Sequence, residues 1–290
     1  MPAEAGRRAH RAGTMHVDTS LQMLPVPPLR SGLIDLHCHL LPGIDDGPAT
    51  LEDALALAKA LVVDGVRHVV ATPHVFPGRY DNRHSSIQGE HARFTQALAA
   101  FNIPLTISYA GEVRLTPEVL DWLAEGELPF LGGPQAATKA LLLEMPDGQV
   151  PLGADRFCDH LLRQGIIPVI AHPERNRGVM ERPQRLQPLV EAGCQLQLTA
   201  GSLLGEFGSK ARATALALLN AGWVHVVASD AHNLGGRAPR LKAARRWLVD
   251  NVGEATARQL TFVGPARLCG VPVATAAPAA PQVPPPSPAA

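Results

Sequence analysis

Histidine and acidic residues recur at the ends of short apolar runs in this sequence. His37 and His39 end the first run, with one residue between them. On an extended segment, side chains at i and i+2 project to the same side, so the two imidazoles can bind one cation. Asp230 and His232 repeat this spacing at the last run. Imidazole together with carboxylate favours manganese, iron or zinc over calcium.

Four further runs end in a residue type that binds metals, namely His74, Glu112, Glu144 and His172. Any one of these alone would more often be a solvated strand end or a structural residue. Their common position relative to the apolar runs argues against coincidence. The sequence therefore predicts a metal centre assembled from separate segments of the chain. Two histidines inside runs, His68 and His225, are interpreted as structural.

Other catalytic schemes find no match in the sequence. A cysteine-dependent phosphatase needs an arginine six positions after its cysteine, and none of the four cysteines has one. A GxxxxGK[ST] phosphate loop, an HExxH zinc motif and a GxSxG nucleophile elbow are also missing from the sequence. Cys38, between two candidate ligands, is expected to point away from them and to pack in the core.

The elements that must position these side chains alternate between apolar runs and amphipathic segments. Seven runs rich in Val, Ile or Leu are predicted to be strands buried on both faces: 33–37, 66–74, 105–112, 140–144, 166–172, 195–199 and 223–230. Helical patterns lie between them, at 51–64, 154–164 and 209–221. This alternation predicts a parallel sheet with helical crossovers. Seven runs favour a closed barrel, whose strands would converge on one rim and gather the ligands there, and an open doubly wound sheet is the alternative.

The composition limits the class of protein. The chain has 290 residues, 46% of them apolar and 18% charged, which suffices for one large domain. Basic and acidic residues number 26 each, so the basic surplus of a nucleic-acid-binding protein is missing. No run approaches the ~18 apolar residues of a membrane-spanning helix. The four cysteines are scattered, which favours a reducing, cytoplasmic setting.

The two ends of the chain differ in composition from its middle. Residues 1–30 contain arginines but no apolar stretch typical of a signal peptide. Residues 271–290 contain seven Pro and seven Ala, a composition typical of disorder. We therefore expect one folded domain over 31–270, between a disordered N-terminal arm and a disordered C-terminal tail.

The order and spacing of the motifs resemble those of the polymerase-and-histidinol-phosphatase (PHP) superfamily of metal-dependent phosphoesterases. The motifs are Asp35-x-His37-x-His39, Thr72-Pro-His74, Glu112, Glu144, Ala171-His172-Pro-Glu-Arg175 and Ser229-Asp230-Ala-His232. Segments 44–48, 200–205 and 230–233 are similar to the bacterial tyrosine-protein phosphatases of capsule and exopolysaccharide operons. The resemblance covers residues 32–270.

This resemblance implies a single-domain α/β fold, a distorted TIM-like (β/α)7 barrel that holds three divalent ions. Mn²⁺ is the expected metal, with iron or zinc as alternatives. The first ion would be held by His37, His39, Glu112 and Asp230. The second would share Glu112 with Glu144 and His172. The third would be held by Asp46, His74 and His232.

Further roles also follow from the resemblance alone. Arg175 and Arg237 match the family's phosphate-binding arginines. Asp35 is expected to orient a ligand histidine. Val75 departs from the family pattern, because relatives often carry a second histidine at this position.

The activity implied by the resemblance is hydrolysis of phosphotyrosine, by attack of a hydroxide that bridges two metal ions. The expected substrate protein is a bacterial tyrosine autokinase that controls capsule or exopolysaccharide synthesis. The alternatives are a PHP phosphatase for a small metabolite such as histidinol phosphate, and a non-catalytic PHP module that binds phosphopeptides. Neither nucleic acid nor a membrane is an expected partner.

Overall fold

The structure, a computed structural model, describes Leu29, residues 31–133 and residues 137–273. The predicted N-terminal arm (1–30) and C-terminal tail (271–290) lie outside these residues, apart from Leu29 and residues 271–273. At this boundary the backbone N–H of Leu29 donates to the carbonyl of Pro272 at 2.9 Å. Within the described ranges, no helix combines the length and the apolar character needed to cross a bilayer.

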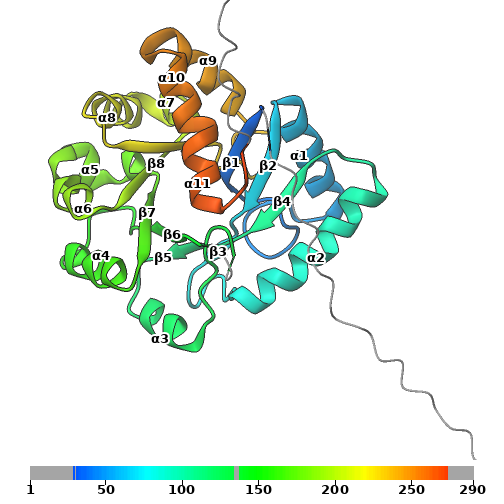
Figure 1. Cartoon of the computed structure of the whole chain (residues 1–290), viewed down its shortest axis with the longest axis horizontal. Helices are drawn as coiled ribbons and strands as arrows, with labels where there is room; N and C mark the ends of the chain where they lie inside the picture. The colour runs from blue at the N-terminus through cyan, green and yellow to red at the C-terminus, as the bar shows by residue number, and fades with distance from the viewer. Residues whose placement is uncertain (1–28, 30, 134–136, 274–290) are drawn as a thin grey trace, which may run out of the picture.

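The described strands form two sheets, and every pairing between named strands is parallel, as the alternation of runs predicts (Figure 1). The smaller sheet has the order β1 (Leu33–Cys38), β2 (Val66–Ala71), β4 (Thr106–Tyr109). The larger sheet has the order β3 (His74–Val75), β5 (Glu112–Arg114), β6 (Lys139–Glu144), β7 (Ile166–Ala171), β8 (Gln195–Thr199), β9 (Val224–Ala228).

Two of the seven predicted strands are each divided in the structure, which corrects the expected count. The run over 66–74 breaks at Pro73, which has no N–H to offer a neighbouring strand. The run over 105–112 breaks at Gly111, where an added Cβ would lie 2.6 Å from Pro129 and 2.7 Å from Val75. After each break the chain passes from the smaller sheet into the larger one.

The two sheets also meet at their other edge. Cys38 at the end of β1 forms an isolated parallel bridge with Ala231, just beyond β9. The backbone N–H of Asp230 donates to the carbonyl of His37 at 2.8 Å. The carboxyl ends of β1 and β9 therefore lie side by side although they are far apart in the sequence.

Helices lie around the strands in Figure 1. The three predicted helices are confirmed as α1 (Leu51–Val63), α4 (Ala154–Arg163) and α8 (Gly208–Asn220). Thr50 caps α1, because its hydroxyl accepts a hydrogen bond from the N–H of Asp53 at 3.2 Å. The remaining helices are α2 (His84–Ala100), α3 (Glu118–Glu125), α5 (Arg177–Glu181), α6 (Gln187–Ala192), α7 (Ala200–Leu204), α9 (Leu241–Val252), α10 (Glu254–Arg258) and α11 (Gly264–Cys269).

An apolar core fills the space between the strands and α11. It includes Ile34, Leu142, Val226 and Leu268, which are fully buried. The guanidinium of Arg267 in α11 donates to the side chain of Gln195 at 3.1 Å, at the first residue of β8. Helix α11 therefore covers the amino ends of the strands and leaves their carboxyl ends open for a site.

Candidate metal centre

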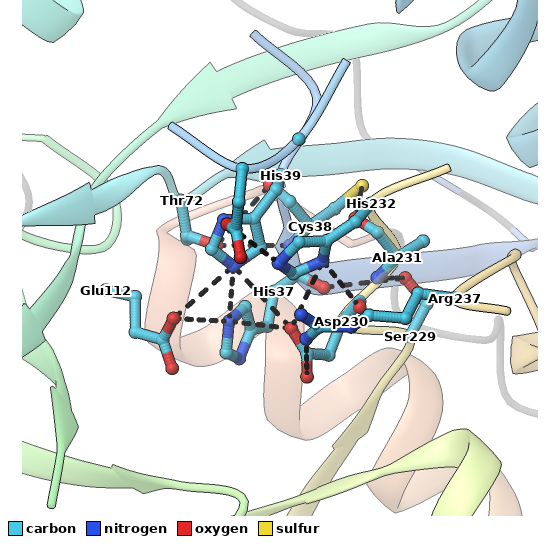
Figure 2. A network of polar contacts seen from close by, with 12 residues as sticks. His37, Cys38, His39, Thr72, Glu112, Ser229, Asp230, Ala231, His232 and Arg237 are labelled. Atoms are coloured by element: carbon cyan, nitrogen blue, oxygen red, sulfur yellow. Dashed lines mark hydrogen bonds and ion pairs between the residues drawn. The ribbon is translucent and has the colours of Figure 1, made fainter. Parts of the chain in front are cut away.

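The fold brings the nine predicted metal ligands together. Most of them lie at or just beyond the carboxyl ends of strands, whereas His74 and Glu112 are the first residues of the short strands β3 and β5. They come from β1 and the loop after it, from β3, β5 and β6, and from the residues that directly follow β7 and β9. Figure 2 shows four of the side chains pointing toward one another: His37, His39, Glu112 and Asp230. Segments far apart in the sequence thus contribute to one cup of imidazoles and carboxylates.

The first predicted group has separations that suit a single cation. The Nε2 atoms of His37 and His39 are 3.2 Å apart. Glu112 Oε2 lies 3.5 Å from the first of these nitrogens and 3.3 Å from the second. Asp230 Oδ1 lies 3.4 Å and 3.6 Å from them. Four ligands at ~2.1 Å from one ion in a tetrahedral arrangement would be ~3.4 Å apart.

Two acceptors fix the orientation of these imidazoles. Nδ1 of His37 lies 2.9 Å from Oε1 of Gln197, and Nδ1 of His39 lies 2.6 Å from Oδ2 of Asp45. An oxygen acceptor at Nδ1 favours the tautomer in which Nδ1 carries the proton. The two facing Nε2 atoms then both present lone pairs to the same space, which is an arrangement that a cation stabilises.

The third predicted group is assembled around Asp46, in the loop between β1 and α1. Its Oδ1 lies 3.3 Å from Nε2 of His74 and 3.3 Å from Nε2 of His232. Nδ1 of His232 donates to the carbonyl of Asp230 at 3.0 Å, so its Nε2 is free to bind a cation. The ligand atoms of Asp46, His74 and His232 lie within 4.8 Å of one another, together with one of His39.

The second predicted group is less closely gathered. Nε2 of His172 lies 2.6 Å from Oε1 of Glu112, whereas Oε2 of Glu112 faces the first group. Glu112 is therefore placed as a bridging ligand would be. Glu144 has a ligand atom within 4.8 Å of those of His74 and Glu112. Its ion-pair partner among the described residues is Arg114, whose Nη1 lies 2.9 Å from Oε2 of Glu144.

Four buried atoms of the cup make no hydrogen bond of good geometry among the described residues, namely His74 Nδ1, Glu112 Oε2, Asp230 Oδ1 and His232 Nε2. They lie close to other ligand atoms instead, as His74 Nδ1 does to Glu112 Oε2 at 2.9 Å. A buried polar atom without a partner costs ~1–3 kcal/mol, and more if it is charged. Here these atoms face a shared space that is lined by nitrogen and oxygen donors. The donor set therefore fits divalent cations such as manganese, iron or zinc.

The carboxylates and imidazoles of the cup shift one another's pKa. Burial would raise the pKa of the Glu112 carboxyl, but His37 and His172 hold that pKa well below its usual range. Burial would lower the pKa of His74, yet the carboxylates of Asp46 and Glu112 raise it to about 11. A site that binds protons this firmly at imidazole also attracts metal cations, and the two compete for the same lone pairs.

Both predicted phosphate-binding arginines lie beside the carboxylate of Asp230. Nη1 of Arg175 pairs with Oδ2 of Asp230, and Nη2 of Arg237 lies 2.6 Å from the same oxygen. The ring of Phe207 lies 4.5 Å below the Arg175 guanidinium carbon. Asp230 has a positive φ of 52°, and so does His172 with 30°, which for residues other than glycine is a strained backbone typical of functional sites.

Asp35 does not orient a ligand histidine, which corrects the expectation from the sequence. Its carboxylate accepts hydrogen bonds from the backbone N–H of Ser229, at 2.9 Å, and from the Ser229 hydroxyl. The spacing of two residues correctly places Asp35 on the same side of β1 as His37. It does not show that the Asp35 side chain lies deeper in the fold than the imidazole of His37. It anchors the residue before Asp230 instead.

Three residues of the site were not predicted from the sequence. Gln197 is a polar residue in a fully buried strand, and Asp45 directly precedes a predicted ligand. Arg114 lies two residues beyond Glu112 and so on the same face of β5. Two other expectations are confirmed, because Cys38 packs in the core and His68 is a buried histidine bonded to Thr106 and Ser108.

A cavity of about 320 Å³ opens above the cup. Predicted ligands and arginines in its lining are Asp46, His74, Glu112, Glu144, His172, Arg175 and Arg237, which form the floor of the cavity. The lining also includes Phe76, Arg79, Tyr80, Arg114, Met145, Asp147 and Asn176. Val75 is buried in the core and does not line the cavity.

Comparisons with known proteins agree with this geometry. The model of the family described as "Capsular polysaccharide synthesis, CpsB/CapC" matches residues 33–269. Tyrosine-protein phosphatase YwqE of Bacillus subtilis is 41% identical over 205 residues, which cover 71% of this chain and 79% of that protein. Tyrosine-protein phosphatase CpsB of Streptococcus pneumoniae is 28% identical over 241 residues, which cover 81% of this chain and 98% of that protein.

A similar solved structure comes from a study of YwqE from B. subtilis and CpsB from S. pneumoniae, described as metal-dependent tyrosine phosphatases. It superposes with a TM-score of 0.77 at 36% identity, covering 83% of this chain and 96% of that chain. A phosphotriesterase homology protein from Escherichia coli has a TM-score of 0.51 at 12% identity, covering 82% of this chain and 98% of that chain. At 12% identity, the similarity to the phosphotriesterase homology protein shows only that the two folds are alike.

Proposed function

Because the chain belongs to the CpsB/CapC family of capsular polysaccharide synthesis proteins, we propose that it is a metal-dependent protein-tyrosine phosphatase. The observation that carries the proposal is the convergence of His37, His39, Glu112 and Asp230 on one space beside two arginines. The family relationship supplies the phosphotyrosine substrate. The geometry supplies a phosphoesterase site.

The nine residues of the cup hold three divalent ions in this proposal. Support comes from the clustered ligand atoms of seven of these residues, from the position of Asp230 beside His37 and His39, and from the contact of Glu112 with His172. The mixed imidazole and carboxylate ligands suit Mn²⁺, with iron and zinc as alternatives. Four carboxylates in the cup (Asp46, Glu112, Glu144 and Asp230) would repel a phosphate dianion unless divalent cations offset their charge. Such ions supply Lewis-acid activation of a water molecule near neutral pH.

The arginines bind the phosphate in this proposal. Arg175 and Arg237 both contact Asp230, and both line the cavity. A guanidinium donates paired hydrogen bonds in a plane that matches two phosphate oxygens, so these residues orient the phosphorus for in-line attack. The stacking of Arg175 on Phe207 restricts the rotation of its guanidinium.

Other residues of the chain keep the ligands in place. Gln197 and Asp45 hold the protons at Nδ1 of His37 and His39, so that both Nε2 atoms stay available. The tyrosine phenolate is a good leaving group, with a pKa of ~10 for its free phenol. A strong general acid is therefore not required.

Two further parts of the proposal concern the closure of the barrel and the identity of the substrate protein. The contact between the ends of β1 and β9 supports a distorted (β/α)7 barrel. The family's description, capsular polysaccharide synthesis, supports a phosphotyrosine-bearing protein of that process as the substrate. A bacterial tyrosine autokinase is the substrate that we propose.

The test is hydrolysis by the purified full chain with manganese, compared with the same protein after chelation. A phosphotyrosyl peptide, a phosphoseryl peptide and histidinol phosphate are offered at equal concentrations. We expect manganese-dependent release of phosphate from the phosphotyrosyl peptide. If only histidinol phosphate is hydrolysed, the protein is a phosphatase for small metabolites and the proposal is wrong. A folded, metal-loaded protein that cleaves none of the three would indicate a binding module.

A further inference from the structure

Aromatic side chains line the cavity together with the predicted ligands and arginines of its floor. The register of β3 and β5 pairs His74 with Glu112 and Val75 with Val113. Phe76 directly follows β3, and Arg114 is the last residue of β5. Residues i and i+2 of an extended segment share a face, so Phe76 and Arg114 lie ~7 Å along the backbone from His74 and Glu112, on the same side.

An aromatic residue and an arginine are in contact at this level. The guanidinium carbon of Arg114 lies 4.9 Å from the centre of the Phe76 ring. Nη1 of Arg114 is held by Glu144 at 2.9 Å and by Asp147 at 3.3 Å. The position of this guanidinium is therefore fixed by two carboxylates and one ring.

A tight turn adds a second aromatic ring. The N–H of Phe76 donates to the carbonyl of Tyr80 at 2.9 Å, and the N–H of Tyr80 donates back at 2.8 Å. Gly78 has a φ of 75°, which the turn requires and which glycine adopts without strain. The Tyr80 ring stacks on His74, with 5.4 Å between ring centres and 9° between ring planes. The second ring is thereby placed directly beside a predicted ligand.

A buried amide holds this turn against the rest of the site. The side-chain amide of Asn82 donates to the carbonyl of His74 at 2.8 Å and to the carbonyl of Ile44 at 2.9 Å. Asn82 thus ties the strand before the turn to the loop that carries Asp46. The two rings are held in a fixed position relative to the floor, and both remain half-buried rather than packed in the core.

We infer that Phe76, Tyr80 and Arg114, which we call the ring wall, receive the phenyl ring of the substrate while the floor receives its phosphate. This inference rests on the proposed function and names the element of the site that selects aryl over alkyl phosphomonoesters. The ring of an aryl phosphate projects from its ester oxygen toward the cavity mouth, where the ring wall lies. Aromatic side chains and a guanidinium are the groups that bind such a ring most favourably.

The test separates binding of the ring from binding of the phosphate. Two non-hydrolysable ligands, phenylphosphonate and methylphosphonate, are titrated calorimetrically into the manganese-loaded full chain. The ratio of their dissociation constants measures the contribution of the ring. The variants are Phe76→Leu and Tyr80→Ala, and Tyr80→Phe keeps the second ring. Phe101→Ala is the matched control, because Phe101 is 57% exposed and does not line the cavity.

We expect wild-type protein, Phe101→Ala and Tyr80→Phe to prefer phenylphosphonate to the same degree. In Phe76→Leu and in Tyr80→Ala the preference should fall ~3- to 10-fold, as expected for the loss of one aromatic contact. The affinity for methylphosphonate should change less than the affinity for phenylphosphonate, because neither variant substitutes a residue of the floor. An unchanged preference in both variants would overturn the inference.

Failure of the ring wall and failure of the proposed function give different results. If wild-type protein dephosphorylates the phosphotyrosyl peptide while both variants retain the preference for phenylphosphonate, only the role of the ring wall is contradicted. If wild-type protein prefers phenylphosphonate but does not dephosphorylate the peptide, only the proposed function is contradicted.

Discussion

Gln197 of β8 accepts a hydrogen bond from Nδ1 of His37 of β1, with 2.9 Å between the two atoms. The same oxygen lies 3.3 Å from the backbone nitrogen of His172. One amide therefore supports two predicted ligands that are 135 positions apart in the sequence (172 − 37). Strand β8 contributes none of the nine predicted ligands, yet it determines which nitrogen of His37 faces the cup.

Loss of this acceptor should weaken metal binding. In Gln197→Leu, Nδ1 of His37 has no partner and the imidazole can rotate or change tautomer. We expect manganese affinity, measured by competition with a chelator, to fall ~10- to 100-fold, as for other supporting residues of metal sites. Gln197→Glu keeps an acceptor oxygen and should lose much less. Equal affinities of Gln197→Leu and wild type would show that the amide does not position His37.

Loss of a ligand should remove activity but leave the fold intact. Because His172 is proposed to share a cation with Glu112, His172→Ala should lower kcat/KM for a phosphotyrosyl peptide ~100-fold or more. The far-ultraviolet circular dichroism spectrum should match that of wild type. His160→Ala is the matched control, since His160 is exposed on α4. Wild-type turnover by the His172 variant is incompatible with the proposed site.

Arg175 should act through the phosphate. In Arg175→Ala we expect the dissociation constant for inorganic phosphate to rise ~10- to 100-fold, because hydrogen bonds to a charged group are lost. Arg175→Lys should recover little of this, since an ammonium lacks the planar pair of donors that stacks on Phe207. Arg93→Ala, at an exposed position of α2, is the control. Phosphate affinity that is unaltered in Arg175→Ala would exclude Arg175 from the phosphate site.

His68 should make the fold sensitive to acid. Burial and, to a smaller extent, the nearby His91 lower the pKa of His68 to about 4. Between Thr106 and Ser108 the imidazole stays neutral in the folded chain, whereas in the unfolded chain it gains a proton below pH ~6.5. The unfolded state therefore binds more protons, and stability falls as the pH drops from about 7 toward 4. We expect His68 to account for a loss of ~2 kcal/mol between pH 7 and pH 5.

Denaturant unfolding of wild type and His68→Gln measures this effect. Both proteins are unfolded with a chelator present, so that release of metal does not contribute. The difference in unfolding free energy between the two should shift by ~2 kcal/mol in favour of His68→Gln between pH 7 and pH 5. A difference that does not depend on pH would show that His68 is not held neutral.

The sequence could predict which side chains gather in the cup but not the residues that support them. His172 directly follows β7, and the carboxyl ends of parallel strands meet at one rim, so local pattern and one topological rule suffice there. His74 and Glu112 end apolar runs of the sequence, yet in the structure they begin the short strands β3 and β5. The role of Gln197 depends on how β8 lies across from β1, and no spacing along the chain encodes that relationship. Asp35 is a second example. Alternation along a strand predicts which face of the sheet a side chain lies on, but not which residue it contacts there.

The strand count fails for a related physical reason. Apolar character runs continuously through Pro73 and Gly111, so periodicity shows one strand where the chain changes sheets. Gly111 is required there because Pro129 and Val75 leave no room for a Cβ. That contact is made by residues distant in the sequence, and the glycine alone does not indicate it.

The central claim is that the cup binds metal ions through the nine side chains gathered there. Crystals of the manganese-loaded protein, measured on both sides of the manganese absorption edge, test it most directly. The account predicts three anomalous peaks in the cup, among His37, Asp46, Glu112, His172 and the other predicted ligands. A cup without anomalous peaks in crystals of manganese-loaded protein would contradict it.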